Sequence, residues 1–196
     1  TVVDATCPIV RKAQKAARGL VEEGYRLVII GAADHPEVRA ILGCVDGEAA
    51  VVEDREGLWC RDGRKPRKVG VIAQTTIDLS LFRELTCQLV GRVPELKVVD
   101  TLCRSTRARQ QEARRLAAAS DFVLVLGGRN SSNTNFLRRI SLLSGTPTLQ
   151  LEEAGELDTA VLSGVERLAI LGGASTPEWI VEEVLDKVLK ACPGQP

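Results

Sequence analysis

This chain of 196 residues contains an internal repeat, which limits the folds that it can adopt. Residues 2–31, VVDATCPIVRKAQKAARGLVEEGYRLVIIG, align without a gap with residues 98–127, VVDTLCRSTRARQQEARRLAAASDFVLVLG, at an offset of 96. Two further pairs of segments match after small insertions: VVED (51–54) with QLEE (150–153), and QTTID (74–78) with ASTPE (174–178). Chance does not explain three matches in register, so we predict two related units, residues 1–96 and 97–196.

Each unit alternates short apolar runs with amphipathic stretches. Four apolar runs end near glycine or small residues, as strands buried on both faces of a parallel sheet do: 26–31, 68–73, 122–127 and 167–171. Helical spacing of three to four recurs in two sets of apolar residues: Ile9, Ala13, Ala16 and Leu20, and Ile180, Val184, Leu185 and Val188. The alternation predicts an α/β fold of two tandem, quasi-repeated three-layer units with mainly parallel sheets.

Composition narrows the classes of partner. Lysine plus arginine and aspartate plus glutamate each number 26, so the formal net charge is 0, and aromatic residues make up 3%. A protein that binds nucleic acid is expected to be basic or to offer aromatic stacking platforms, so we expect no nucleic-acid partner. No apolar run approaches the roughly 20 residues of a membrane helix, and no signal peptide opens the chain. We therefore expect no membrane partner and a cytoplasmic location.

Polar and glycine-rich segments follow the predicted strands, where ligands bind in parallel α/β sheets. They form two matching sets: DATCP (4–8), GAADHPE (31–37) and AQTT (73–76), then DTLCRST (100–106), GGRNSSN (127–133) and GGAST (172–176). Each segment precedes a helical pattern, so backbone N–H groups and the positive end of a helix dipole point the same way. The segments predict a site made of two related halves at the carboxyl ends of the strands.

Two of the six cysteines, Cys7 and Cys103, occupy equivalent positions in these segments. A helix start favours the thiolate that binds metal, so the pair suggests a shared metal, most naturally iron–sulfur. Two cysteines retained from a duplicated ancestor are the equal alternative. The other four lie outside the matching segments and are not expected to be ligands: Cys44, Cys60, Cys87 and Cys192. We expect most of the cysteines to be reduced, small, buried hydrophobic residues.

The remaining candidates are polar residues at predicted helix starts. His35, the only histidine, lies two residues before Glu37 and suits proton delivery or an anion contact, with a structural role as the alternative. The equivalent place in the second unit holds three small polar residues that suit a diphosphate or simple helix capping: Ser131, Ser132 and Asn133. The last loop repeats this pattern with Ser175 and Thr176, whose counterparts in the first unit are Thr75 and Thr76.

In their order along the chain, the motifs DATCP, HPEV, QTT, NSSNT and GASTPE resemble the LytB family, the 4-hydroxy-3-methylbut-2-enyl diphosphate reductases of the non-mevalonate isoprenoid pathway. The resemblance covers about residues 2–190. It implies three similar α/β domains around a 4Fe–4S cluster, with one cysteine from each domain. It also implies an enzyme that removes the substrate's hydroxyl as water to give isopentenyl and dimethylallyl diphosphate. Ferredoxin or flavodoxin would supply the electrons, in a bacterial cytoplasm or a plastid stroma.

The resemblance also implies a role for each candidate residue. Cys7 and Cys103 would bind the cluster as its metal ligands. Glu37 would relay the proton to the leaving hydroxyl, and Thr75 would position Glu37. Five residues would hold the diphosphate of the substrate: His35, Ser131, Ser132, Asn133 and Ser175.

The chain departs from the family pattern in length. It contains no methionine and opens at Thr1 directly on an apolar strand, TVVDATCP, which indicates a fragment that begins inside a larger protein. It resembles the second and third domains only, so the third cluster cysteine is expected from a missing first domain. We expect the isolated chain to be a poor catalyst with exposed apolar surface near residues 1–4. Arg104 and Ser105 also replace the residues usual in the family after Cys103.

Two other functions remain open from the sequence. The chain could be a non-catalytic diphosphate-binding remnant, or another three-cysteine cluster enzyme such as quinolinate synthase. A dinucleotide-binding dehydrogenase is disfavoured, because no GxGxxG motif follows a predicted strand.

Overall fold

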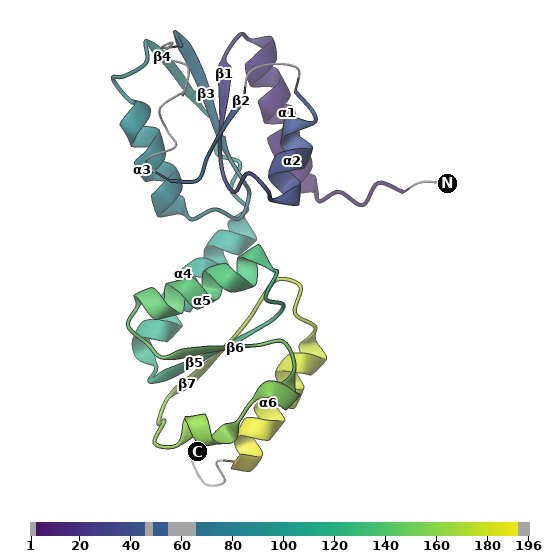
Figure 1. Cartoon of the computed structure of the whole chain (residues 1–196), viewed down its shortest axis with the longest axis vertical. Coiled ribbons are helices and arrows are strands. Elements are labelled where there is room, and N and C mark those ends of the chain that lie inside the picture. Colours follow the sequence, from purple (N-terminus) through teal and green to yellow (C-terminus); the bar gives the residue numbers. More distant parts are fainter. Residues whose placement is uncertain (1–2, 46–48, 55–65, 192–196) are drawn as a thin grey trace. The chain divides into compact units, whose positions relative to one another are not determined.

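The computed structural model describes residues 3–45, 49–54 and 66–191. The chain divides into two compact units, Thr1–Arg107 and Ala108–Pro196. Each unit is a parallel β-sheet flanked by helices (Figure 1). None of the described helices is both long and apolar enough to cross a membrane.

The first unit contains a four-stranded parallel sheet with the strand order β2-β1-β3-β4. Its strands are β1 (Arg26–Ile30), β2 (Ala49–Val52), β3 (Lys68–Ala73) and β4 (Glu95–Val98). Its helices are α1 (Pro8–Glu22), α2 (Pro36–Leu42) and α3 (Leu79–Leu89). In Figure 1 the sheet lies between α3 on one side and the pair α1 and α2 on the other.

The alternation of side chains along β1 divides the first core into two layers. Leu27 and Ile29 pack with the buried residues of α1 and α2, whereas Val28 and Ile30 pack with those of α3. Gly70 in β3 allows a close approach of α1, because a Cβ atom there would lie 2.9 Å from Leu20 Cδ2. Burial on both faces explains why the central strands are continuous apolar runs.

The second unit repeats this arrangement around a three-stranded parallel sheet with the order β6-β5-β7. Its strands are β5 (Phe122–Leu126), β6 (Thr148–Leu151) and β7 (Leu168–Gly172). Residues of α4 (Arg104–Ala119) and α5 (Ser132–Leu143) pack on one face. The other face carries α6 (Glu178–Ala191) and the short 3-10 helices η2 (Ala154–Glu156) and η3 (Thr159–Leu162).

The predicted α/β fold with parallel sheets is confirmed, and all four predicted strands are present as β1, β3, β5 and β7. The short strands β2, β4 and β6 had no such signal, because most of their residues are only partly buried. Two details were wrong. No strand includes Val3, which is 83% exposed, and Leu185 is 44% exposed rather than on the buried face of α6. Thr1 and Val2 lie outside the described residues.

Candidate functional site

Apart from the segment that carries Cys7, which no described strand precedes, the loops that carry the predicted site residues follow the carboxyl ends of strands in both units. Matching backbone hydrogen bonds hold their first residues. The N–H of Gly31 donates to the carbonyl of Val52 at 3.0 Å, and the N–H of Gly127 donates to the carbonyl of Leu151 at 2.9 Å. The loops after β1 and β5 therefore start from equivalent positions in the two units.

Glu37 and Thr75 form the most direct polar contact between predicted residues. The backbone N–H of Thr75 donates to Glu37 Oε1 at 2.7 Å, and the Thr75 hydroxyl donates to Glu37 Oε2 at 2.9 Å. Thr75 is 6% exposed, and Glu37 is partly buried at the start of α2. A carboxylate that accepts a hydrogen bond at each of its two oxygens has one preferred orientation, which is what proton delivery requires.

His35 precedes α2 and caps it. Its Nδ1 accepts a hydrogen bond from the Glu37 N–H at 3.2 Å, so the neutral imidazole carries its proton on Nε2. The ring is partly exposed. The capping role and a second role as hydrogen-bond donor are therefore compatible, because they use different nitrogen atoms.

The two cysteine loops are built alike. In the first, Asp4 accepts from the Thr6 N–H at 2.9 Å and pairs with Arg11 at 2.6 Å. In the second, Asp100 accepts from the Leu102 N–H at 3.0 Å and pairs with Arg107 at 3.1 Å. Each Asp–Arg ion pair spans a cysteine that lies directly before a helix, Cys7 before α1 and Cys103 before α4.

Cys103 is the more tightly held of the two cysteines. Its N–H donates to the carbonyl of Thr75 at 2.9 Å, and its Sγ lies 3.0 Å from Ser105 Oγ. Burial raises the pKa of the Cys103 thiol, but hydrogen bonds from Ser105 and Thr106 outweigh it and lower the pKa to about 7. The thiolate that a metal ligand needs is thus accessible near neutral pH. A hollow of about 600 Å³ lies beside Cys103, with Lys12 and Arg104 in its lining.

These contacts form one chain of hydrogen bonds within the first unit. The chain runs from the His35 ring to the Glu37 N–H, from the Glu37 carboxylate to Thr75, and from the Thr75 carbonyl to the Cys103 N–H. The structure therefore brings His35, Glu37, Thr75 and Cys103 together. Cys7 is exposed and takes no part in this series of hydrogen bonds among the described residues.

The second unit places its predicted residues at the N-terminus of α5. Ser131 is the N-cap, and its Oγ accepts from the Thr134 N–H at 3.3 Å. Asn133 is 8% exposed, yet neither its amide nitrogen nor its amide oxygen has a hydrogen-bond partner among the described residues. Such an orphaned amide is costly unless a ligand or water satisfies it. Ser132 is partly buried and Ser175 is exposed.

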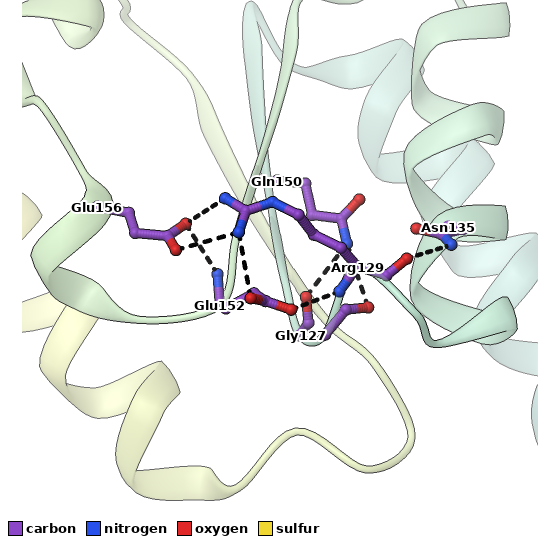
Figure 2. A network of polar contacts seen from close by, with 7 residues as sticks. Gly127, Arg129, Asn135, Gln150, Glu152 and Glu156 are labelled. Atoms are coloured by element: carbon purple, nitrogen blue, oxygen red, sulfur yellow. Dashed lines mark hydrogen bonds and ion pairs between the residues drawn. The ribbon is translucent and has the colours of Figure 1, made fainter.

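A polar network that the sequence analysis missed supports the loop before α5 (Figure 2). Arg129 pairs with Glu152 at 3.1 Å and with Glu156 at 2.8 Å, and its backbone N–H donates to Glu152 Oε1 at 2.6 Å. Its carbonyl accepts from Asn135 Nδ2 at 2.7 Å. Gln150 Nε2 donates to the carbonyl of Gly127 at 3.2 Å. The available signal was the match of VVED with QLEE, which places a glutamate after the second strand of each unit.

The expectation that most cysteines are buried was wrong for the described ones. Cys7 and Cys87 are exposed, Cys44 and Cys103 are partly buried, and all four are free thiols. Cys60 and Cys192 lie outside the described residues. Within the described ranges, no three histidine, cysteine or acidic side chains gather closely enough to hold a metal ion.

Known proteins are similar to this chain over nearly its whole length. Residues 1–189 match the family described as LytB protein. The 4-hydroxy-3-methylbut-2-enyl diphosphate reductase of Aquifex aeolicus is 39% identical over 99% of this chain and 68% of its own length. The Geobacter sulfurreducens reductase is 40% identical over 95% of this chain and 66% of its own length.

Two solved structures are also similar. One is a structure of (E)-4-hydroxy-3-methyl-but-2-enyl diphosphate reductase, with a TM-score of 0.61 and 38% identity over 97% of this chain and 68% of that one. The other, the Plasmodium falciparum reductase, has a TM-score of 0.88 at 24% identity over 95% of this chain and 59% of that one, and shows the fold alone. The chain spans about two thirds of the length of its curated relatives.

Proposed function

The chain belongs to the LytB family, and from that premise we propose that it serves the reduction of 4-hydroxy-3-methylbut-2-enyl diphosphate. The hydroxyl of the substrate leaves as water, and the products are isopentenyl and dimethylallyl diphosphate. The bacterial relatives support a cytoplasmic location. The match to the family over residues 1–189 favours this reaction over that of quinolinate synthase.

The proposal rests most directly on the buried amide of Asn133, which has no hydrogen-bond partner among the described residues. A diphosphate oxygen beside the N-terminus of α5 would accept from the Nδ2 atom of Asn133, at the end of the helix where the dipole favours a negative charge. The hydroxyl hydrogen of Ser131 is also available, because its oxygen serves as the cap acceptor. We assign diphosphate binding to Ser131, Ser132, Asn133 and Ser175 in the second unit.

In the first unit, the geometry supports an anion contact and a proton relay. His35 Nε2–H is available as a donor to a diphosphate oxygen, because Nδ1 already caps α2. Glu37 holds the proton for the leaving hydroxyl, and Thr75 fixes the orientation of the carboxyl group through two hydrogen bonds. When Glu37 is protonated, one carboxyl oxygen carries the proton for the leaving hydroxyl, and both oxygens keep a lone pair that can accept from Thr75.

Cys7 and Cys103 are the residues that would hold a 4Fe–4S cluster. The lowered pKa of Cys103 and the equivalent Asp–Arg ion pairs that span both cysteines fit thiolate ligands. Such a cluster, when bound, supplies one-electron transfer to the substrate. The third thiolate is proposed to come from outside the described residues, and ferredoxin or flavodoxin is proposed as the electron donor.

A diphosphate-binding chain without catalysis is the second candidate, because the described residues gather no set of three metal donors. Iron and sulfide per chain after anaerobic reconstitution separate the two. We expect replacement of Cys7 or Cys103 by alanine to lower the iron content, with Cys87→Ala as the exposed control. Equal iron in all variants, or none in the unchanged chain, would remove Cys7 and Cys103 from the proposal.

The diphosphate role is tested by thermal unfolding with inorganic diphosphate. A ligand at about 100 times its Kd stabilises a protein by about 2.7 kcal/mol. We expect Asn133→Ala to leave the free energy of unfolding without diphosphate nearly unchanged. It should raise the Kd for diphosphate about tenfold, the effect expected when one hydrogen bond to a charged group is lost. Leu143→Ala, at the exposed end of α5, is the control. Equal diphosphate binding by the Asn133 variant contradicts the proposal.

A further inference from the structure

We propose that Glu53 and Glu152 are equivalent positioning residues, each of which holds the substrate-binding loop of its own unit. The inference rests on the proposed function, which makes these loops the ones that contact the substrate. Neither glutamate belongs to the set of residues assigned to binding or proton transfer.

The two glutamates make the same contact in the two units. Glu53 Oε1 accepts from the backbone N–H of Ala33 at 2.8 Å, and Glu152 Oε1 accepts from the backbone N–H of Arg129 at 2.6 Å. Ala33 and Arg129 are equivalent at the offset of 96, and the glutamates are equivalent at the offset of 99 that follows the insertion. The contact therefore belongs to the repeated architecture and not to one local sequence.

The position of this contact explains what it controls. Each glutamate directly follows an edge strand, β2 or β6, and reaches the loop after the neighbouring strand, β1 or β5. The bonded N–H lies two residues before the helix cap of its loop, His35 or Ser131. A charge-assisted hydrogen bond at this point ties the loop to the sheet before its functional side chains begin.

The second unit strengthens the contact with an ion-pair network (Figure 2). The Arg129 guanidinium bridges Glu152 and Glu156, and Glu156 also accepts from the Glu152 N–H at 3.2 Å. The first unit has alanine at the equivalent position, so its loop is held differently. There, Gln74 Oε1 accepts from the Ala32 N–H at 3.1 Å beside the contact of Glu53.

The exposure of the Arg129 and Glu152 side chains indicates that their network positions the loop and does not stabilise the fold as a whole. The Arg129 and Glu152 side chains are 60% and 40% exposed, and ion pairs this exposed add little to folding stability. Ser131 already caps α5, so the helix does not need Glu152 for its formation. The main consequence of the network is thus a single conformation for the loop that carries Ser131 and Asn133.

The test in the second unit compares Glu152→Ala with Glu153→Ala, a neighbouring exposed glutamate. Amide hydrogen exchange of Arg129 reports the contact directly, and titration with inorganic diphosphate reports its consequence. We expect Glu152→Ala to speed exchange at Arg129 and to weaken diphosphate binding about tenfold, which corresponds to about 1.4 kcal/mol. Glu153→Ala is expected to change neither. Glu152→Gln, which keeps an acceptor oxygen, should recover part of the binding.

The test in the first unit uses the cluster-loaded enzyme, because its loop leads to Glu37. We expect Glu53→Ala to speed amide exchange at Ala33 and to lower kcat more than it raises KM. Glu152→Ala is expected to show the opposite split, with the larger effect on KM. Glu22→Ala, an exposed glutamate at the end of α1, is the control for the first unit.

The outcomes distinguish this inference from the proposed function. Unchanged amide exchange in the Glu53 and Glu152 variants would overturn the positioning role and leave the proposed function intact. Faster exchange with unchanged diphosphate binding and kinetics would also overturn it, because the contact would then be structural only. If the unchanged chain binds no diphosphate, the proposed function fails, and the positioning role fails with it even where exchange responds.

Discussion

Replacement of Thr75 by valine isolates one hydrogen bond at the candidate site. The Thr75 hydroxyl donates to Glu37 Oε2 at 2.9 Å, whereas its backbone N–H donates to Oε1 at 2.7 Å. Valine has nearly the same shape as threonine, so it removes the hydroxyl bond and keeps the backbone bond. Thr75 is 6% exposed, so water does not easily replace the lost donor.

The magnitude follows from the charge and exposure of the pair. A hydrogen bond to a charged group contributes about 1.5–3 kcal/mol. Glu37 is only partly buried and retains one partner, so we expect the lower end, a loss of about 1.5 kcal/mol in the free energy of unfolding. With an m-value of about 1–3 kcal/mol per molar urea, the midpoint falls by about 0.5–1.5 M.

The assay is urea unfolding of the cluster-free chain, with Thr86→Val as the matched control. Thr86 Oγ1 is buried in α3 and has no hydrogen-bond partner among the residues that the structure describes, so the same substitution there removes an unsatisfied hydroxyl. We expect Thr86→Val to raise the urea midpoint slightly, because the free energy of unfolding rises by up to about 1 kcal/mol. Opposite signs for one chemical change would show that the partner of the hydroxyl decides its contribution.

A loss below about 0.5 kcal/mol for Thr75→Val would refute this reasoning, because surface substitutions without specific contacts fall in that range. A double-mutant cycle with Glu37→Gln identifies the interaction. We expect a coupling energy of about 1 kcal/mol between Thr75 and Glu37. Additive effects would mean that the stability loss comes from packing and not from the hydrogen bond.

Two further predictions concern Cys103 and Gly70. The lowered pKa of Cys103 means that its thiol ionises as the pH rises through about 7. Alkylation of Cys103 in the cluster-free chain should therefore reach half its maximal rate near that pH. Ser105→Ala should move this midpoint upward, and an unchanged midpoint would argue against the Ser105 contact. Gly70→Ala should destabilise the chain by about 1–3 kcal/mol in urea, because its Cβ would overlap with Leu20. The double variant with Leu20→Val should recover part of this loss; full additivity would contradict the overlap.

Much of the architecture was readable from the sequence because it depends on local patterns. Continuous apolar runs predicted β1 and β5, since a strand covered on both faces needs no polar side chains. Polar residues before helical patterns located the caps His35 and Ser131. Edge strands such as β4 escaped prediction, because their residues meet the core on one side only and their burial is mixed.

The contacts of the candidate site depended on residues distant in the sequence. Spacing alone placed Glu37 and Thr75 in matching loops, but it did not show that both oxygens of Glu37 accept from Thr75. The same applies to Glu152, which lies 23 residues from Arg129 along the chain. Such contacts require the register between parallel strands, which a linear pattern does not specify.

The repeat, the strand–helix alternation and the end of the strands at which the candidate residues lie could all be predicted from the linear sequence, because they follow from periodicity and chain direction. Which polar groups have hydrogen-bond partners could not be predicted in this way, because it depends on how the elements pack. In the folded chain Thr75 contacts both Glu37 and Cys103, and the buried amide of Asn133 has no hydrogen-bond partner among the described residues. Glu53 and Glu152 accept from equivalent backbone N–H groups. Hydrogen bonds are directional and short, so they are settled only when packed elements set the positions of donor and acceptor to within fractions of an ångström.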